Sequence, residues 1–234
     1  MSTETIPSDL PATQPSEPAI PPLEAGDRLT SIEFRRRYEA MPDCNHAELI
    51  QGVVYMPSPV SAGHSEPHAD LLFWLGHYRV HTPGVRAGDN GTLWLDFDSA
   101  PQPDCYLRLE EAAGGQSKLV DGYIHGAPEL IVEISASTAS YDLHDKLNAY
   151  HENGVKEYVV WRVRDREVDW FVQREGQLVR AEPGEDGVYC SEVFPGLWLD
   201  TAPLISADLA RVLATLQAGL DSEPHQEFVK RIGR

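Results

Sequence analysis

The chain has 234 residues, enough for one domain with a sizeable core, and a formal net charge of −18 at pH 7. This acidic balance argues against a broad nucleic-acid-binding or membrane-binding surface, but it leaves open a local basic cleft or a bound cation. No stretch approaches 18 apolar residues and no basic start precedes an apolar core, so we expect no membrane span and no signal peptide. The three cysteines Cys44, Cys105 and Cys190 form no C-x-x-C pair. They predict reduced thiols in a cytoplasmic protein, not a disulfide framework or structural zinc.

The first 26 residues differ in composition from the rest of the chain. They contain six prolines, with Ser, Thr and Glu between them. Such a segment cannot bury enough apolar surface to offset its ordering entropy, so residues 1–26 are predicted to be a disordered tail. A helix is expected from Thr30 to just before Pro42, because Thr30 and Glu33 fit a capping box. Its buried stripe would consist of Ile32, Phe34 and Tyr38.

The middle of the chain alternates between strand and helix patterns. Residues 47–56 match a hairpin about the turn Gln51-Gly52, and apolar residues recur at helical spacing over 64–81. Asp89-Asn90-Gly91 is a strong turn signal within a strand-like stretch. We therefore expect, in order, a hairpin over 47–56, a helix over 64–81, two strands over 85–98, a strand over 102–109 and a stretch over 110–126 that is mostly loop.

The second half is rich in strands and closes with a helix. Gly154 is a good C-terminal stop for a preceding helix, and residues 221–234 are polar and expected to fray. Helices cluster early and late with strands between them, so the predicted fold class is α+β or mixed α/β. The expected elements are strands over 129–135, 156–164, 167–173, 177–182 and 188–193, an edge segment over 194–199, and helices over 142–153 and 204–220.

One predicted strand carries a charge in an otherwise apolar run. Leu130-Ile131-Val132 follows Pro128 and predicts a fully buried strand, in which Glu133 is the next residue. Strand side chains alternate, so Glu133 and Ser135 face the same side. A lone charge in a buried strand is costly unless it meets a cation or a hydrogen-bond donor. This position is therefore the first candidate for a functional site.

Other polar residues could join Glu133. Gln102-Pro103-Asp104 is a second acidic motif that leads into an apolar stretch. Asp142, Lys146 and Tyr150 are spaced four apart, so they share one helix face. Two carboxylates at strand positions with a nearby lysine indicate a divalent-metal phosphodiesterase site.

These motifs resemble the PD-(D/E)XK nuclease superfamily, and more closely its Uma family of restriction-endonuclease-like proteins. The similar features run from about Thr30 to Trp198 and include a His that opens a helix, His64, and the segment GVKEYVVW. One feature departs from the superfamily, whose third motif ends in a lysine where this chain has Ser135. The family pattern implies that Lys146 supplies that lysine from the following helix. The motif residues occur in the order Glu48, Pro103-Asp104, Glu133-Ile134-Ser135, Asp142 and Lys146.

The resemblance implies a restriction-endonuclease-like central mixed sheet flanked by helices, over residues 27–220, between the tail 1–26 and a polar segment 221–234. It implies an endonuclease that hydrolyses phosphodiester bonds in DNA with Mg²⁺ or Mn²⁺. We expect a cytoplasmic protein with DNA as its partner and no membrane, and a homodimer is one option for its assembly. The implied metal ligands are Asp104, Glu133 and Glu48, and the implied catalytic residues are Asp104, Glu133, Lys146, Glu48 and His64.

Each acidic candidate also has an ordinary structural explanation. Asp104 could simply start a strand, and Glu48 could face solvent from its hairpin. Glu133 could be a buried acid paired with an arginine such as Arg108. The acidic charge of the chain favours a further alternative, a catalytically silent relative that keeps the fold as a binding or interaction domain.

The basic candidates have alternatives as well. Lys146 could be the exposed helix-surface partner of Asp142, a contact worth only a few tenths of a kcal/mol. His64 and His68 lie four apart on one helix face, a spacing that suits zinc. Because no third ligand or intervening glutamate accompanies them, His64 is better explained as a substrate-contacting or proton-transfer group.

Overall fold

The computed structural model describes residues 19–44, 46–56, 59–136 and 139–233. Its helices are α1 (Ser31–Glu39), α2 (Ala62–His81), η1 (Glu111–Ala113), α3 (Ala139–Tyr141), η2 (Asp142–Lys146), α4 (Leu147–Glu152), α5 (Thr201–Ile205), α6 (Leu209–Leu220) and α7 (Glu223–Ile232). Its strands are β1 (Glu48–Ile50), β2 (Val53–Tyr55), β3 (Val85–Gly88), β4 (Leu93–Trp94), β5 (Cys105–Leu109), β6 (Lys118–Val120), β7 (Tyr123–His125), β8 (Leu130–Ser135), β9 (Glu157–Arg162), β10 (Glu167–Arg174), β11 (Gln177–Arg180), β12 (Val188–Cys190) and β13 (Trp198–Asp200).

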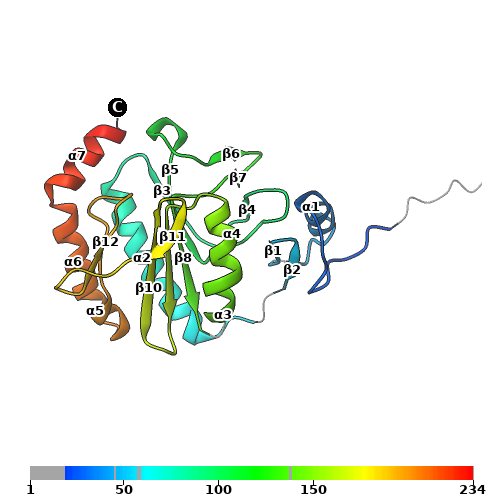
Figure 1. Cartoon of the computed structure of the whole chain (residues 1–234), viewed down its shortest axis with the longest axis horizontal. Helices are drawn as coiled ribbons and strands as arrows, with labels where there is room; N and C mark the ends of the chain where they lie inside the picture. The colour runs from blue at the N-terminus through cyan, green and yellow to red at the C-terminus, as the bar shows by residue number, and fades with distance from the viewer. Residues whose placement is uncertain (1–18, 45, 57–58, 137–138, 234) are drawn as a thin grey trace, which may run out of the picture.

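A mixed sheet of six strands forms the centre of the fold (Figure 1). Its order is β11-β10-β9-β8-β5-β3, in which β8 and β9 are parallel and the other neighbours antiparallel. Strand β8 lies inside the sheet and all six of its residues are buried, which is why its sequence is almost continuously apolar. The predicted mixed α+β class and the central position of this strand are confirmed.

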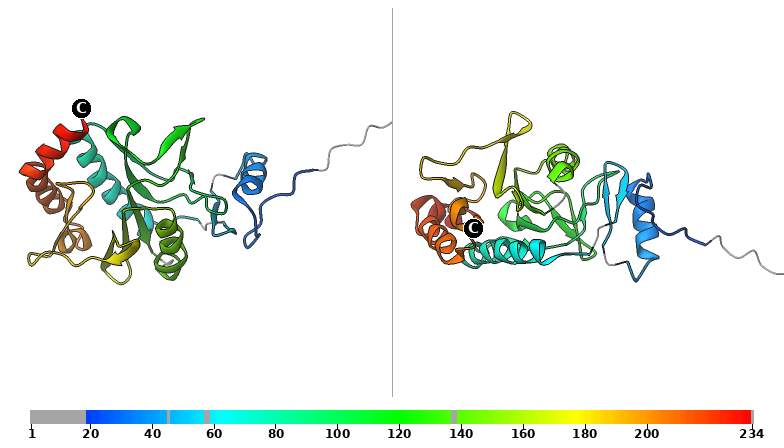
Figure 2. Two further views of the ribbon diagram at one scale, coloured as in Figure 1. Left: turned by 45° about the horizontal axis from the view of Figure 1, so that its top comes forward. Right: turned by 90° about the horizontal axis from the view of Figure 1, so that it is seen from below.

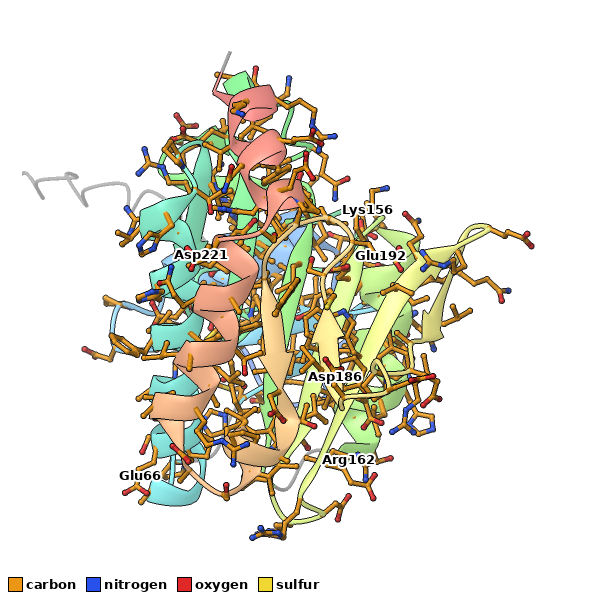
Figure 3. All side chains as sticks on the ribbon, turned by 90° about the vertical axis from the view of Figure 1, so that its left-hand side faces the viewer. Glu66, Lys156, Arg162, Asp186, Glu192 and Asp221 are labelled. Carbon is orange, nitrogen blue, oxygen red and sulfur yellow. The ribbon has the colours of Figure 1, made fainter. Side chains whose placement is uncertain are left out.

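The two faces of the sheet bury different cores. Leu130, Val132 and Ile134 point to the core that α2 and α6 cover, and Ile131 points to the core beside α4. Figure 2 shows α2 and α6 on one side of the sheet and α4 on the other. Because strand residues alternate, Glu133 lies on the α4 side with Ile131. Figure 3 shows Lys156 and Arg162 at opposite ends of β9, beside β8.

The N-terminal elements follow their local signals closely. The Thr30 hydroxyl caps α1 by accepting from the Glu33 amide at 3.3 Å, as the capping-box pattern predicts. The β1–β2 turn has positive φ at both Gln51 and Gly52, the conformation that a two-residue hairpin requires. Ile32 is 75% exposed, so its predicted place in the buried stripe is wrong, because that stripe passes through Phe34 instead.

Part of the segment predicted to be disordered is ordered. Residues 1–18 lie outside the described part of the chain. Leu23 is buried in the core that contains Phe34, and the Gly26 amide donates to the Val54 carbonyl at 2.8 Å. The prediction of disorder up to residue 26 is therefore wrong at its C-terminal end, because Leu23 packs into this core and Gly26 bonds to β2.

Residues 85–126 differ from their prediction in pairing. Strands β3 and β4 flank the predicted turn but do not pair, since β3 joins β5 and β4 runs parallel to β7. The expected loop over 110–126 contains the β6–β7 hairpin, with positive φ at both Asp121 and Gly122. Asp-Gly between Leu119-Val120 and Tyr123-Ile124 is itself a hairpin signal, so the loop prediction missed local information.

The C-terminal region is more ordered than predicted. The expected helix over 204–220 is split into α5 and α6, with Ala207 at φ 58° between them and Asp208 capping α6. The residues expected to fray form α7, which Ser222 caps and which buries His225 and Phe228. Phe228 belongs to the same core as α2, so tertiary packing stabilises a segment whose composition is polar. No helix in the described part of the chain is long and apolar enough to cross a membrane.

Candidate active site

Asp104, immediately before β5, and Glu133, within β8, lie side by side at two neighbouring strands of the central sheet. Asp104 directly precedes β5, whose Cys105 pairs with Val132 of β8, so Asp104 lies opposite Glu133. The Ile134 amide donates to Asp104 Oδ2 at 2.7 Å, and the Asp104 amide approaches Glu133 Oε2 at 3.4 Å. Each carboxylate thus faces a backbone amide of the segment that carries the other acid. The two acids face the same side of the sheet, at the place where β5 begins.

Lys146 reaches this pair from the helix that follows β8. Its Nζ lies 2.9 Å from Glu133 Oε1 and 3.0 Å from Glu48 Oε1, and its side chain is only 6% exposed. The alternative of an exposed lysine on the helix surface is therefore wrong. The partner of Glu133 is Lys146, so the alternative pairing with Arg108 is wrong as well. The turn from Asp142 to Lys146 is a π-helix, a distortion frequent at functional sites.

Glu48 enters the same site from the N-terminal hairpin. It is buried in β1, at 7% exposure, and its Oε1 accepts both from Lys146 and from the Gln102 amide at 2.7 Å. The alternative of a solvent-facing hairpin residue is wrong, because the hairpin packs across the segment that leads into β5, where the Leu49 and Ala100 backbones pair. Glu48 and Glu133, which are far apart in sequence, therefore meet at one lysine.

Two histidines of α2 also contact Asp104. His64 Nε2 lies 3.2 Å from the Asp104 carboxylate, and His68 Nε2 lies 2.8 Å from the Asp104 carbonyl oxygen. Their spacing of four residues, which puts them on one helix face, thus lets both histidines contact Asp104. Among the described residues, no three His, Cys, Asp or Glu side chains are grouped so that they could hold a metal ion by themselves.

The electrostatics of the site follow from burial and pairing. Burial acts to raise the pKa of Asp104, but the His64 pair and the Ile134 amide outweigh it and hold that pKa below its usual value. The hydrogen bond to Asp104 raises the pKa of His64, which favours the imidazolium. Burial would lower the pKa of Lys146, but Glu133 and Glu48 raise it well above its usual range, so Lys146 is charged.

Glu133 is under opposing influences. Burial, with the neighbouring acids, holds the pKa of Glu133 well above its usual value, although Lys146 acts to lower it. Its three described hydrogen-bond partners, Lys146 Nζ, Tyr150 Oη and the Asp104 amide, are all donors. On Oε1 a carboxylate accepts from both Lys146 Nζ and Tyr150 Oη, whereas a proton there would face the ammonium. The geometry therefore favours the ionised form, sustained by the Lys146 ammonium.

The candidate residues share one cavity of about 280 Å³. Its lining includes all five residues that the sequence singled out: Glu48, His64, Asp104, Glu133 and Lys146. Tyr141 adds an aromatic wall, with its ring 5.5 Å from Lys146 Nζ and 4.4 Å from the Tyr55 ring. The cavity combines acidic oxygens, the Lys146 ammonium and the imidazoles of His46, His64 and His68, the groups from which hydrolytic sites are commonly built.

Sequence reasoning missed the supporting role of two residues. Tyr150 is fully buried and donates to Glu133 Oε1 at 2.8 Å. The spacing of Lys146 and Tyr150 by four residues was the available signal, since it places both on the face that meets β8. The Gln102 amide, which fixes Glu48, had no signal, because a backbone contact 54 residues away leaves no trace in composition.

A family model described as "Uma2: Putative restriction endonuclease" matches residues 33–202 of this chain. The chain belongs to the Uma2 family. The matched region includes the five candidate residues that line the cavity, from Glu48 to Lys146. Membership of the Uma2 family supports a nuclease-like function. No curated protein matches the chain.

A solved structure has a similar fold. It is described as "a putative nuclease belonging to DUF820" from Anabaena variabilis ATCC 29413. The similarity has a TM-score of 0.57 at 13% sequence identity and covers 73% of this chain and 96% of that one. At this identity the likeness establishes the fold of this Uma2 protein and nothing about its activity.

The donor set of the cavity fits a hard divalent cation. Mg²⁺ prefers oxygen ligands and is commonly held by one or two carboxylates together with waters and substrate phosphates. Asp104 and Glu133 supply two such carboxylates at one wall of the cavity. The cavity volume of about 280 Å³ leaves room for waters or phosphate oxygens beside them.

Proposed function

We propose that this Uma2 protein is an endonuclease that hydrolyses phosphodiester bonds in DNA with Mg²⁺ or Mn²⁺. The observation that carries the proposal is the convergence of Asp104, Glu133 and Lys146 on one cavity from two strands and a helix. A merely structural ion pair would need neither a second acid nor an open volume beside it. Family membership supports the nuclease class, and DNA and the identity of the cation belong to the proposal.

Asp104 and Glu133 would hold the cation, with Glu48 as a further acid that acts directly or through water. Once bound, such an ion lowers the pKa of a coordinated water and neutralises charge on the scissile phosphate. Hydrolysis forms a bond between a water oxygen and phosphorus and breaks the bond to the leaving sugar oxygen. The protein must therefore orient the phosphate, balance its growing negative charge and manage the released proton.

Lys146 and His64 would perform the last two tasks. The Lys146 ammonium sits in a nearly dry position beside Glu133, where a fixed positive charge stabilises a developing negative charge more than it would in water. His64 is held by Asp104 and favours the imidazolium form, which can donate a hydrogen bond or a proton to a phosphate or leaving oxygen. Lys146 thereby supplies, from the helix after β8, the positive charge that Ser135 cannot supply at the usual position of the motif lysine.

The test is cleavage by purified protein with Mn²⁺ at low salt, on linear, nicked, branched and single-stranded DNA. Low salt is needed because a protein of net charge −18 will bind DNA weakly. We expect cleavage of at least one substrate, abolished by chelation and by Asp104→Asn or Glu133→Gln. Glu185→Gln, which changes an exposed acid far along the chain, is the matched control and should cleave like wild type. Mn²⁺ binding without cleavage of any substrate would instead identify a silent binding domain.

A further inference from the structure

Lys146 is the positive charge placed between two buried acids of the cavity. Its Nζ bridges Glu48 Oε1 at 3.0 Å and Glu133 Oε1 at 2.9 Å, and the exposed fractions of the three side chains are 6%, 9% and 4%. Removing one partner from a buried ion pair leaves the other charge uncompensated and is strongly destabilising. Glu48 and Glu133 therefore depend on this ammonium for as long as no other cation is near.

The two oxygens of Glu133 have different surroundings. Oε1 accepts from Lys146 Nζ and from Tyr150 Oη at 2.8 Å. Oε2 has the Asp104 amide at 3.4 Å as its described partner, a long contact that leaves its acceptor capacity largely unused. An incoming cation can thus reach Glu133 through Oε2, beside Asp104, while the ammonium stays on Oε1.

We propose that Lys146 is the resident counter-ion of this site, neutralising Glu48 and Glu133 in the metal-free protein and opposing the entry of a divalent cation. The inference rests on the proposed function, because it assigns the divalent cation to the same carboxylates. An ammonium and a dication that share one carboxylate repel each other, and burial strengthens this repulsion. Lys146 accordingly sets how much free cation the site needs before it is occupied.

A purely organising role for Lys146 predicts the opposite effect. If the ammonium served only to hold the acids in position for a cation, its removal would disorder them and weaken cation binding. If it is the resident counter-ion, its removal leaves two unbalanced acids that bind a dication more tightly. The sign of the change in affinity therefore separates the two roles, without any measurement of activity.

The experiment is isothermal titration of metal-free protein with Mn²⁺ at low salt. Lys146→Met keeps most of the side-chain volume and removes the charge, and we expect it to bind Mn²⁺ at least about tenfold more tightly than wild type. Lys146→Arg keeps the charge and should show no such gain. Lys118→Met, at an exposed position of β6, is the control and should match wild type. Equal or weaker binding by Lys146→Met would overturn the proposal.

The remaining outcomes are also decisive. Should Lys146→Met fail to fold without metal, Mn²⁺ should take the place of the ammonium and restore the wild-type circular dichroism spectrum. Failure to fold in excess Mn²⁺ would overturn the proposal. Absence of Mn²⁺ binding by wild type and by all variants would refute the proposed function itself, whereas wild-type binding without a gain in Lys146→Met would refute only this inference.

Discussion

The hydrogen bond from Tyr150 to Glu133 offers a sharp test of the charge state of the site. Tyr150→Phe removes one hydroxyl that lies 2.8 Å from Glu133 Oε1 and keeps the fully buried ring. A hydrogen bond to a charged group contributes about 1.5–3 kcal/mol, against about 0.5–1.5 kcal/mol for a neutral pair. We therefore expect Tyr150→Phe to lower the free energy of unfolding by about 2 kcal/mol. For a domain of this size that lowers Tm by about 4–8 °C.

Tyr158 supplies a matched control for this prediction. It is also fully buried, packs against Tyr150 with ring centroids 5.0 Å apart, and donates to the neutral Asp142 carbonyl at 3.0 Å. Urea unfolding at about pH 8 should give Tyr158→Phe a smaller loss than Tyr150→Phe, with unchanged m-values for both. A loss in Tyr150→Phe equal to or below that in Tyr158→Phe would refute the ionised Glu133 on which the site depends.

Three other predictions address pH, packing and catalysis. Burial raises the pKa of Glu157 from 4.5 to about 7, so the folded protein favours the protonated acid. This contribution to the free energy of unfolding is complete below pH 4.5, and about 3 kcal/mol is lost as the pH rises through 7. Thermal melts of Glu157→Gln between pH 4 and 8 should lack this decline, and an unchanged slope would show that Glu157 titrates normally. Gly219→Ala should destabilise by about 1–3 kcal/mol in urea unfolding, because its Cβ would lie 2.3 Å from the Gly196 carbonyl oxygen, whereas Gly76→Ala, which meets nothing within 4 Å, should be neutral or stabilising. Lys146→Ala, assayed at saturating Mn²⁺, should lower the cleavage rate by about two to three orders of magnitude, and wild-type cleavage would remove Lys146 from the mechanism.

The parts of the site that the sequence predicted are those with a local signal. The apolar run around Glu133 identified a buried strand, and the four-residue spacing placed Lys146 and Tyr150 on one helix face. The family resemblance supplied the link between these motifs. Glu48, Asp104 and Lys146 then proved to line one cavity, as the motif order had suggested.

The parts that could not be predicted depend on contacts distant in sequence. The Gln102 amide holds Glu48 across 54 residues, and no pattern within either segment reports this. Helix α7 has a polar composition and is stabilised by burying Phe228 against the core that α2 covers. The β6–β7 hairpin is different, because Asp121-Gly122 was a local signal that was outweighed by the polar residues around it.

The most direct test of the account is the location of a bound cation. Crystals soaked in Mn²⁺ should show an anomalous diffraction peak between the carboxylates of Asp104 and Glu133, and Asp104→Asn crystals treated in the same way should lose it. A Mn²⁺ peak at any other place, with the Lys146 ammonium still bridging Glu48 and Glu133 as it does here, would contradict the account.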